Sequence, residues 1–181
     1  MKRIFLLSAF VLLASLSFSQ NSDDTIVEMP YMKNTVYFEA LGNGITYSLN
    51  YDRILAKHGK FALAGRIGGT YNSATNGFVP EFAFPLEISV LYGRRNHQME
   101  FGAGYTAVHL EEDSNDYLGY YDEDNRPIRF RTLRFGYRYQ NSKGGPFFRV
   151  GVMLLVMDRP NLYHSYWPWG GVSLGYTIKT K

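Results

Sequence analysis

Eight segments of this 181-residue chain alternate polar and apolar residues, and the connections between them are short and long in turn. Residues 45–52 show the pattern best, because Tyr47 and Leu49 fall on one face of an extended strand and Ser48 on the other. A period of two indicates a strand whose two faces meet different surroundings. We therefore predict an all-β, eight-stranded antiparallel up-and-down β-barrel, with strands at residues 35–42, 45–55, 60–72, 84–93, 98–110, 128–140, 146–157 and 167–180.

The N-terminus has the pattern of a secretion signal. Basic residues at positions 2 and 3 precede an apolar run at 4–16, which is shorter than the ~20 residues that a membrane-spanning helix needs. Small residues flank Phe18, so we expect cleavage before Gln20. The expected organisation is a signal peptide at 1–19, a flexible periplasmic lead at 20–34 and the barrel at 35–181.

Export and alternation together favour a transmembrane barrel in an outer membrane, apolar outside and polar within. The expected turns at 56–59, 94–97 and 141–145 are short, as on the periplasmic side of such barrels, whereas 73–82, 111–127 and 158–166 are longer. Outward aromatic residues fall near both strand ends, as in the aromatic girdles at membrane interfaces. Near the short turns they are Phe38, Tyr51, Phe61, Tyr92, Phe101, Tyr137, Tyr139, Phe148 and Tyr176, and near the loops they are Tyr47, Tyr71, Phe84, Tyr105 and Trp167.

The residues that alternate with the outward apolar ones are expected to point into the barrel, and they include four acidic and four basic residues. An eight-stranded barrel is only wide enough for its side chains to fill it, so an open pore is not expected. Isolated buried charges cost several kcal/mol each, and the set should therefore form a paired ionic network of internal struts. Its members are Glu39, Asp52, Arg66, Glu87, Glu100, Arg134, Arg138 and Arg149.

Three local features do not fit the simple pattern. Pro85 lacks a ladder donor, so we expect its strand to begin beyond it or to bulge there. Ile128 and Phe130 have the opposite parity to the rest of their strand, which predicts a bulge or an early exit from lipid. The Asn-Gly pair in residues 42–44 favours a tight hairpin turn.

Two stretches carry a family resemblance: NTVYFEALGNG at residues 34–44 and YSLNYDR at 47–53. Here the chain resembles uncharacterised outer-membrane β-barrel proteins of Gram-negative bacteria and, more broadly, small OmpA-like barrels. The resemblance implies insertion by the barrel-assembly machinery, and it implies no shared activity or catalytic residues. Such barrels often end on an aromatic residue, whereas this chain ends on Lys181.

Composition excludes several classes of function. Cysteine is absent, so disulfides, thiolate zinc sites and thiol nucleophiles are excluded. Removal of residues 1–19 leaves 17 basic against 16 acidic residues, which gives no electrostatic case for nucleic acid. The acidic loop 111–127 lacks the spacing of an EF-hand, and we interpret it as a solvated surface loop. No metal or cofactor is expected.

The favoured function is a non-enzymatic cell-envelope barrel with a structural or surface-binding role. Its partners would be outer-membrane lipid and an extracellular partner of unknown identity, for which the loop tyrosines are candidate contacts: Tyr117, Tyr120 and Tyr121. The ligand and the physiological role do not follow from the sequence.

Two alternatives remain open. An outer-leaflet lipid hydrolase could use His109, Ser114 and Glu111, or His164 beside Ser165, although no nucleophile-elbow motif is present. A soluble lipocalin-like carrier would invert the faces, bury the Val, Leu and Phe set, and expose the charged set. His58 and His97 fall in short turns, where solvated polar residues are expected.

Overall fold

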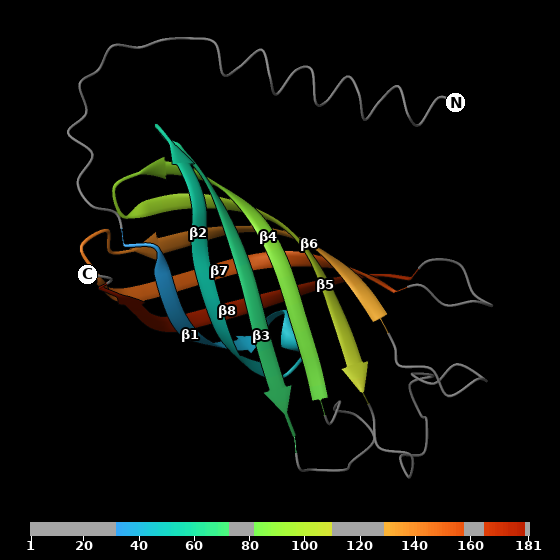
Figure 1. The fold of residues 1–181 in the computed structure, drawn as a ribbon. Coiled ribbons are helices and arrows are strands. Elements are labelled where there is room, and N and C mark those ends of the chain that lie inside the picture. Colours follow the sequence, from blue (N-terminus) through green and yellow to red (C-terminus); the bar gives the residue numbers. More distant parts are fainter. Residues whose placement is uncertain (1–31, 73–81, 110–128, 158–164, 180–181) are drawn as a thin grey trace, which may run out of the picture.

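A computed structural model describes residues 32–72, 82–109, 129–157 and 165–179, which form one closed antiparallel barrel (Figure 1). Each strand pairs with its neighbours in sequence, and β1 pairs with β8 to close the ring. This confirms the prediction of an all-β, eight-stranded up-and-down barrel. The strands are β1 (Asn34–Leu41), β2 (Tyr47–His58), β3 (Phe61–Tyr71), β4 (Phe82–Arg94), β5 (His97–His109), β6 (Arg129–Gln140), β7 (Gly145–Met157) and β8 (Ser165–Ile178).

The barrel has two different ends. At one end, which we call the turn end, short turns join β2 to β3, β4 to β5 and β6 to β7, and β1 begins and β8 finishes there (Figure 1). At the opposite loop end, the short 3-10 helix η2 (Gly42–Gly44) connects β1 to β2. The predicted signal peptide and nearly all of the predicted lead lie outside the described residues. Among the described residues, no helix is long and apolar enough to cross a membrane.

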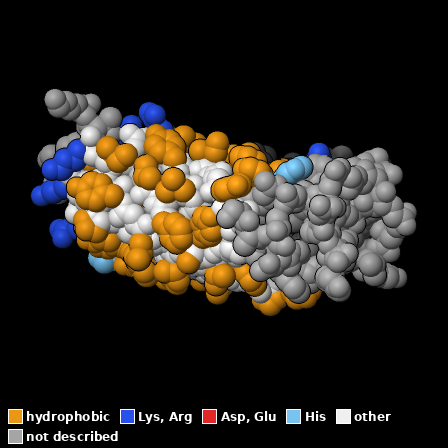
Figure 2. Space-filling model, turned by 90° about the horizontal axis from the view of Figure 1, so that it is seen from below, with side chains coloured by type: hydrophobic (Ala, Val, Ile, Leu, Met, Phe, Trp, Pro, Cys, Tyr) orange, Lys and Arg blue, Asp and Glu red, His pale blue; other side chains and the backbone are white. Residues whose placement is uncertain are grey.

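The two faces of the wall differ in chemistry along every strand. In β4, for example, Ile88 is 60% exposed whereas its neighbour Glu87 is 3% exposed. The outward face carries large apolar and aromatic side chains on all eight strands, and the inward face carries most of the polar and charged ones. The alternation in the sequence thus marks inside and outside as expected, with the apolar set outside (Figure 2).

Pro85 lies inside β4, so the prediction that the strand begins beyond it or bulges there is wrong. The strand begins at Phe82, and Pro85 pairs with Thr106 of β5 in an unshifted register. On the β3 side the pairing passes over Gly68 and resumes at Thr70 with the same offset. A Cβ on Gly68 would lie 3.0 Å from the Pro85 ring, so this glycine makes room for the proline.

The expected bulge near Phe130 is also absent from the described part of β6. Phe130 pairs with Thr106 and Met157 without a register shift, and its side chain is buried inside the barrel. It packs in an apolar cluster with Ala83, Val108 and Leu155. The parity therefore continues unbroken, and it is the barrel interior that changes from polar to apolar near the loop end. Ile128 lies outside the described residues.

Candidate functional site

The barrel interior contains all eight charged residues that the inward parity selected. None of them is more than 5% exposed, so each needs a partner within the protein. They come from β1 to β7, and ion pairs connect them across the lumen. The eight are Glu39, Asp52, Arg66, Glu87, Glu100, Arg134, Arg138 and Arg149.

Glu39 is the centre of the larger part of this network. Its carboxylate accepts hydrogen bonds from three arginines on three different strands. Arg134 Nη2 donates to Glu39 Oε1 at 3.0 Å, and Arg149 Nη2 donates to the same oxygen at 2.9 Å. Arg66 Nη2 donates to Glu39 Oε2. One buried carboxylate therefore ties β1 to β3, β6 and β7.

Glu87 is the second acceptor for the same arginines. Arg134 Nε donates to Glu87 Oε2 at 3.0 Å, and Arg66 and Arg149 form ion pairs with Glu87 at 3.6 and 3.5 Å. Glu39 and Glu87 thus share three cations. Shared, hydrogen-bonded partners are the arrangement that offsets the desolvation of buried charges.

Arg138 and Asp52 form a separate two-pronged pair nearer the turn end. Arg138 Nη1 donates to Asp52 Oδ2 at 3.0 Å and Nη2 donates to Oδ1 at 2.5 Å, while Nε donates to Gln140 Oε1 at 3.0 Å. Glu100 connects this pair to the larger network, because it lies 3.3 Å from Arg149 Nη1 and 4.0 Å from Arg138 Nη1. All eight charges therefore belong to one network.

Two buried aromatic rings lie against arginines of the network. Tyr37 and Phe147 stack with ring centroids 4.8 Å apart. The Arg149 guanidinium lies 4.8 Å from the centre of the Tyr37 ring, and that of Arg138 lies 5.1 Å from the centre of the Phe147 ring. Such contacts stabilise a guanidinium that has lost water. The sequence analysis did not single out these rings, although Tyr37 shares the parity of Glu39 and Phe147 that of Arg149.

β1 and β2 form a short hairpin, as predicted, with Leu41 N–H donating to the Thr46 carbonyl at 2.6 Å, but its connection folds into the barrel. All three residues of η2 are buried. Asn43 Nδ2 donates to Glu87 Oε2 at 2.6 Å, Asn43 Oδ1 accepts from Arg134 Nη2 at 3.3 Å, and the Asn43 carbonyl accepts from Thr106 Oγ1 at 3.1 Å. The Asn-Gly pair thus lies in a buried 3-10 turn, where Asn43 gains partners in the ionic network.

Apolar clusters close the interior on either side of the charges. Toward the turn end the cluster consists of Ile54, Ala62, Ala64 and Leu91. Toward the loop end Ile45 and Trp169 pack against the cluster that contains Phe130. Apolar clusters thus flank the ionic network, together with buried polar residues such as Gln98 and Gln140 toward the turn end. Chemically, this arrangement fixes the eight strands relative to one another, and large fully buried side chains such as Arg138, Arg149 and Phe130 fill the space that a pore would need.

Each residue set proposed for ester hydrolysis includes residues outside the described ranges, so it stays a prediction. Of these residues, the structure describes His109, the exposed last residue of β5, and Ser165, the first residue of β8. His58 ends β2, and His97 Nδ1 lies 2.6 Å from the Tyr137 hydroxyl at the turn end. Other predicted site residues lie outside the described residues: Glu111, Ser114, Tyr117, Tyr120, Tyr121 and His164.

The described residues contain no group of three or more His, Cys, Asp or Glu side chains that could hold a metal ion. Comparison of the chain with family models, with curated proteins and with solved structures finds no match. A functional argument therefore depends on the geometry and chemistry of the barrel itself.

Proposed function

We propose that this chain is a non-enzymatic outer-membrane barrel protein with a structural or surface-binding role. The observation that carries the proposal is the outer wall: every strand exposes at least two large apolar or aromatic side chains. A soluble monomer rarely exposes a continuous apolar surface of more than a few hundred Å². Lipid is the solvent that suits a wall of this kind on all sides of a closed barrel.

The distribution of charge supports the same proposal. All four acidic residues in the described ranges are buried in the interior, as are four of the basic ones. The soluble-carrier alternative requires the reverse, with charges outside and an apolar cavity within. The observed orientation of the two faces therefore favours a membrane barrel over a carrier.

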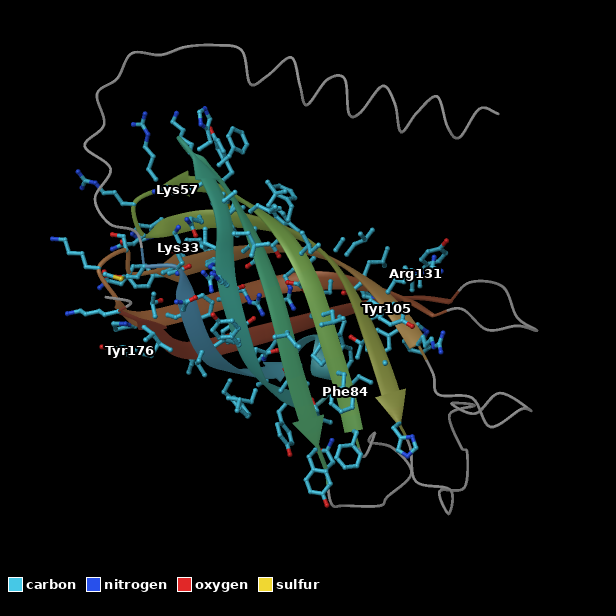
Figure 3. All side chains as sticks on the ribbon, viewed as in Figure 1. Lys33, Lys57, Phe84, Tyr105, Arg131 and Tyr176 are labelled. Atoms are coloured by element: carbon cyan, nitrogen blue, oxygen red, sulfur yellow. The ribbon has the colours of Figure 1, made fainter. Side chains whose placement is uncertain are left out.

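The exposed aromatic residues support a membrane position for the wall. Tyr176 lies toward the turn end, whereas Phe84 and Tyr105 lie toward the loop end, and each is exposed on the outer face (Figure 3). Aromatic side chains prefer the height at which hydrocarbon meets water. In the proposal these residues belong to two interfacial rings, with the apolar middle of each strand between them.

The closed interior supports a role for the body of the barrel that does not involve conduction. An ionic network flanked by apolar clusters contributes rigidity and leaves recognition to the loop end. The candidate contacts there, the three tyrosines of the 111–127 loop, lie outside the described residues. In this proposal the physiological partners are outer-membrane lipid and, during insertion, the barrel-assembly machinery.

Fractionation of cells that express the full chain, followed by purification of the mature protein, tests the proposal. The expected result is recovery with the outer membrane, extraction only by detergent, and gel mobility that changes on heating, as closed barrels show when they unfold. Recovery of a monodisperse protein in plain buffer without amphiphile would overturn the proposal and would favour the soluble carrier.

A further inference from the structure

The turn end carries a ring of exposed cations, which we call the cationic collar. Its members are Lys33, Arg53, Lys57, Lys60, Arg94, Arg95, Lys143 and Lys179, and each is exposed. They lie where β1 begins, in and beside the three turns, and where β8 ends. Because these positions follow one another around the closed barrel, the collar encircles the turn end, where the labelled Lys33 and Lys57 lie (Figure 3).

Within the described ranges, the exposed charged residues are all basic, and most of them lie in the collar. The four acidic residues in the described ranges all point into the barrel, so no exposed carboxylate accompanies the collar there. The loop end has only two exposed basic residues within the described ranges, Arg129 and Arg131. The space-filling view shows most of the visible lysine and arginine side chains at one end of the apolar wall, and no acidic side chain among the coloured residues of that face (Figure 2).

The collar is continuous with the apolar wall. Lys60 directly precedes the exposed Phe61, Lys179 directly follows the exposed Ile178, and Arg53 lies two residues from the exposed Leu55. Long basic side chains at such a boundary keep their stems on apolar surface and extend their charges toward the aqueous side. The charges then stand at the height of lipid headgroups, beside the acyl chains that would cover the wall.

We propose that the cationic collar binds the anionic headgroups of phospholipids in the leaflet at the turn end. This inference rests on the proposed membrane function and adds a lipid preference to it. A polybasic segment at a membrane surface attracts anionic lipid through charge, and each cation contributes roughly a fivefold preference. A soluble polyanion would not need cations placed along the boundary of an apolar wall, and this placement favours phospholipid.

A matched pair of double variants tests the collar. Arg94→Gln with Arg95→Gln removes two collar charges, and Arg129→Gln with Arg131→Gln removes the same number from the loop end. Each full-length mature protein is placed in nanodiscs of phosphatidylcholine with a minor fraction of phosphatidylglycerol, and native mass spectrometry counts the retained lipids. We expect the wild type to retain phosphatidylglycerol preferentially, the collar variant to lose this preference about 25-fold because two cations are removed, and the loop-end variant to keep it.

Two outcomes would overturn the lipid assignment. One is an equal phosphatidylglycerol preference in the wild type and the collar variant. The other comes from a parallel arm to which lipopolysaccharide is added. It is a stronger retention of lipopolysaccharide than of phosphatidylglycerol, lost when Arg94 and Arg95 are replaced. Heat-modifiable mobility in pure phosphatidylcholine is measured for every variant, and it separates this proposal from the previous one. Normal insertion with no lipid preference rejects only the collar, whereas a wild type that needs no amphiphile rejects the membrane function itself.

Discussion

Asn43 and Glu87 meet inside the barrel: Asn43 Nδ2 donates a 2.6 Å hydrogen bond to Glu87 Oε2, although the residues are 44 positions apart. The bond joins the inward η2 turn to the ionic network, and the Asn43 side-chain oxygen faces Arg134 on its other side. The amide therefore contacts one buried acid and one buried base. It can satisfy both because an amide group carries a donor and an acceptor.

Removal of this amide should destabilise the barrel. We expect Asn43→Ala to lower the free energy of unfolding by about 1–3 kcal/mol, because Glu87 and Arg134 each lose a buried partner. Urea unfolding from lipid vesicles, followed by tryptophan fluorescence, measures the change. Lys143→Ala in an exposed turn is the control and should leave the midpoint unchanged. Equal midpoints for the two variants would show that η2 does not stabilise the interior.

The pair of Arg138 and Asp52 should behave as a coupled unit. Arg138→Met leaves Asp52 buried without its two-pronged partner and should cost about 3–5 kcal/mol, and Asp52→Leu should have a similar cost. The double variant removes both charges, so its loss should be smaller than the sum of the two single losses. A double-mutant cycle on the unfolding free energy measures this coupling. Strict additivity would mean that the two residues do not depend on each other.

Glycines in the strands, such as the inward Gly175 and the outward Gly69, should be sensitive to size only where a large neighbour needs the space. Gly175 lies opposite Tyr37, and a Cβ there would meet the Tyr37 backbone at 2.6 Å. Gly175→Ala should therefore lower the unfolding free energy by about 1–3 kcal/mol. Gly69→Ala is the matched control, because nothing lies within 4 Å of its added Cβ, and stability should stay level or rise by up to about 1 kcal/mol. The reverse order would contradict the close approach of Tyr37 and Gly175.

The inward turn stores backbone strain at non-glycine residues. Leu41 has φ 60° and ψ −129°, and Ile45 has φ 71° and ψ −60° with Thr46 N–H donating to the Gly44 carbonyl at 2.9 Å. Residues with a side chain rarely adopt a positive φ, and β-branched ones least of all. This strain persists because the turn gains contacts in the interior on both sides of Asn43.

A glycine at Leu41 should relieve part of this strain. Leu49 is also an exposed leucine, but it lies in regular β2, so Leu49→Gly is the control. Both variants lose an exposed leucine, and only Leu41→Gly removes a strained side chain. We expect Leu41→Gly to be more stable than Leu49→Gly by about 1–2 kcal/mol in the same urea assay. Equal losses would argue against strain at position 41.

Much of the fold could be predicted from the sequence, because alternation reports directly on which face each residue occupies. The expected strands overlap the observed ones, and parity alone selected the charged interior residues. The predicted bulge near Phe130 was wrong because the interior was assumed to be polar throughout, whereas it is apolar there. The prediction that the strand begins beyond Pro85 or bulges there was also wrong. The glycine that accommodates this proline lies on the neighbouring strand and not beside it in sequence.

The partner choice within the interior could not be predicted. Asp52 and Arg66 are direct cross-strand partners in the β2–β3 register, and that proximity suggests an ion pair. In the structure Asp52 holds Arg138 across the lumen, while Arg66 contacts Glu39 and Glu87. Pairing across a closed barrel depends on the height and reach of every side chain, which the register of two strands does not contain.

The apolar wall leads to a depth-dependent prediction that separates a membrane barrel from a soluble one. Ile88 lies at the middle of β4, whereas Ile178 is the last residue of β8, and both are exposed on the outer face. In lipid, Ile88→Arg should lower the unfolding free energy by about 2–4 kcal/mol and Ile178→Arg by about 0–1 kcal/mol, because arginine costs most at the bilayer midplane. In water, an exposed arginine at either site should be tolerated equally. Urea unfolding of both variants from phosphatidylcholine vesicles therefore measures the surroundings of the wall. Similar midpoints for the two variants would mean that the middle of β4 does not face hydrocarbon.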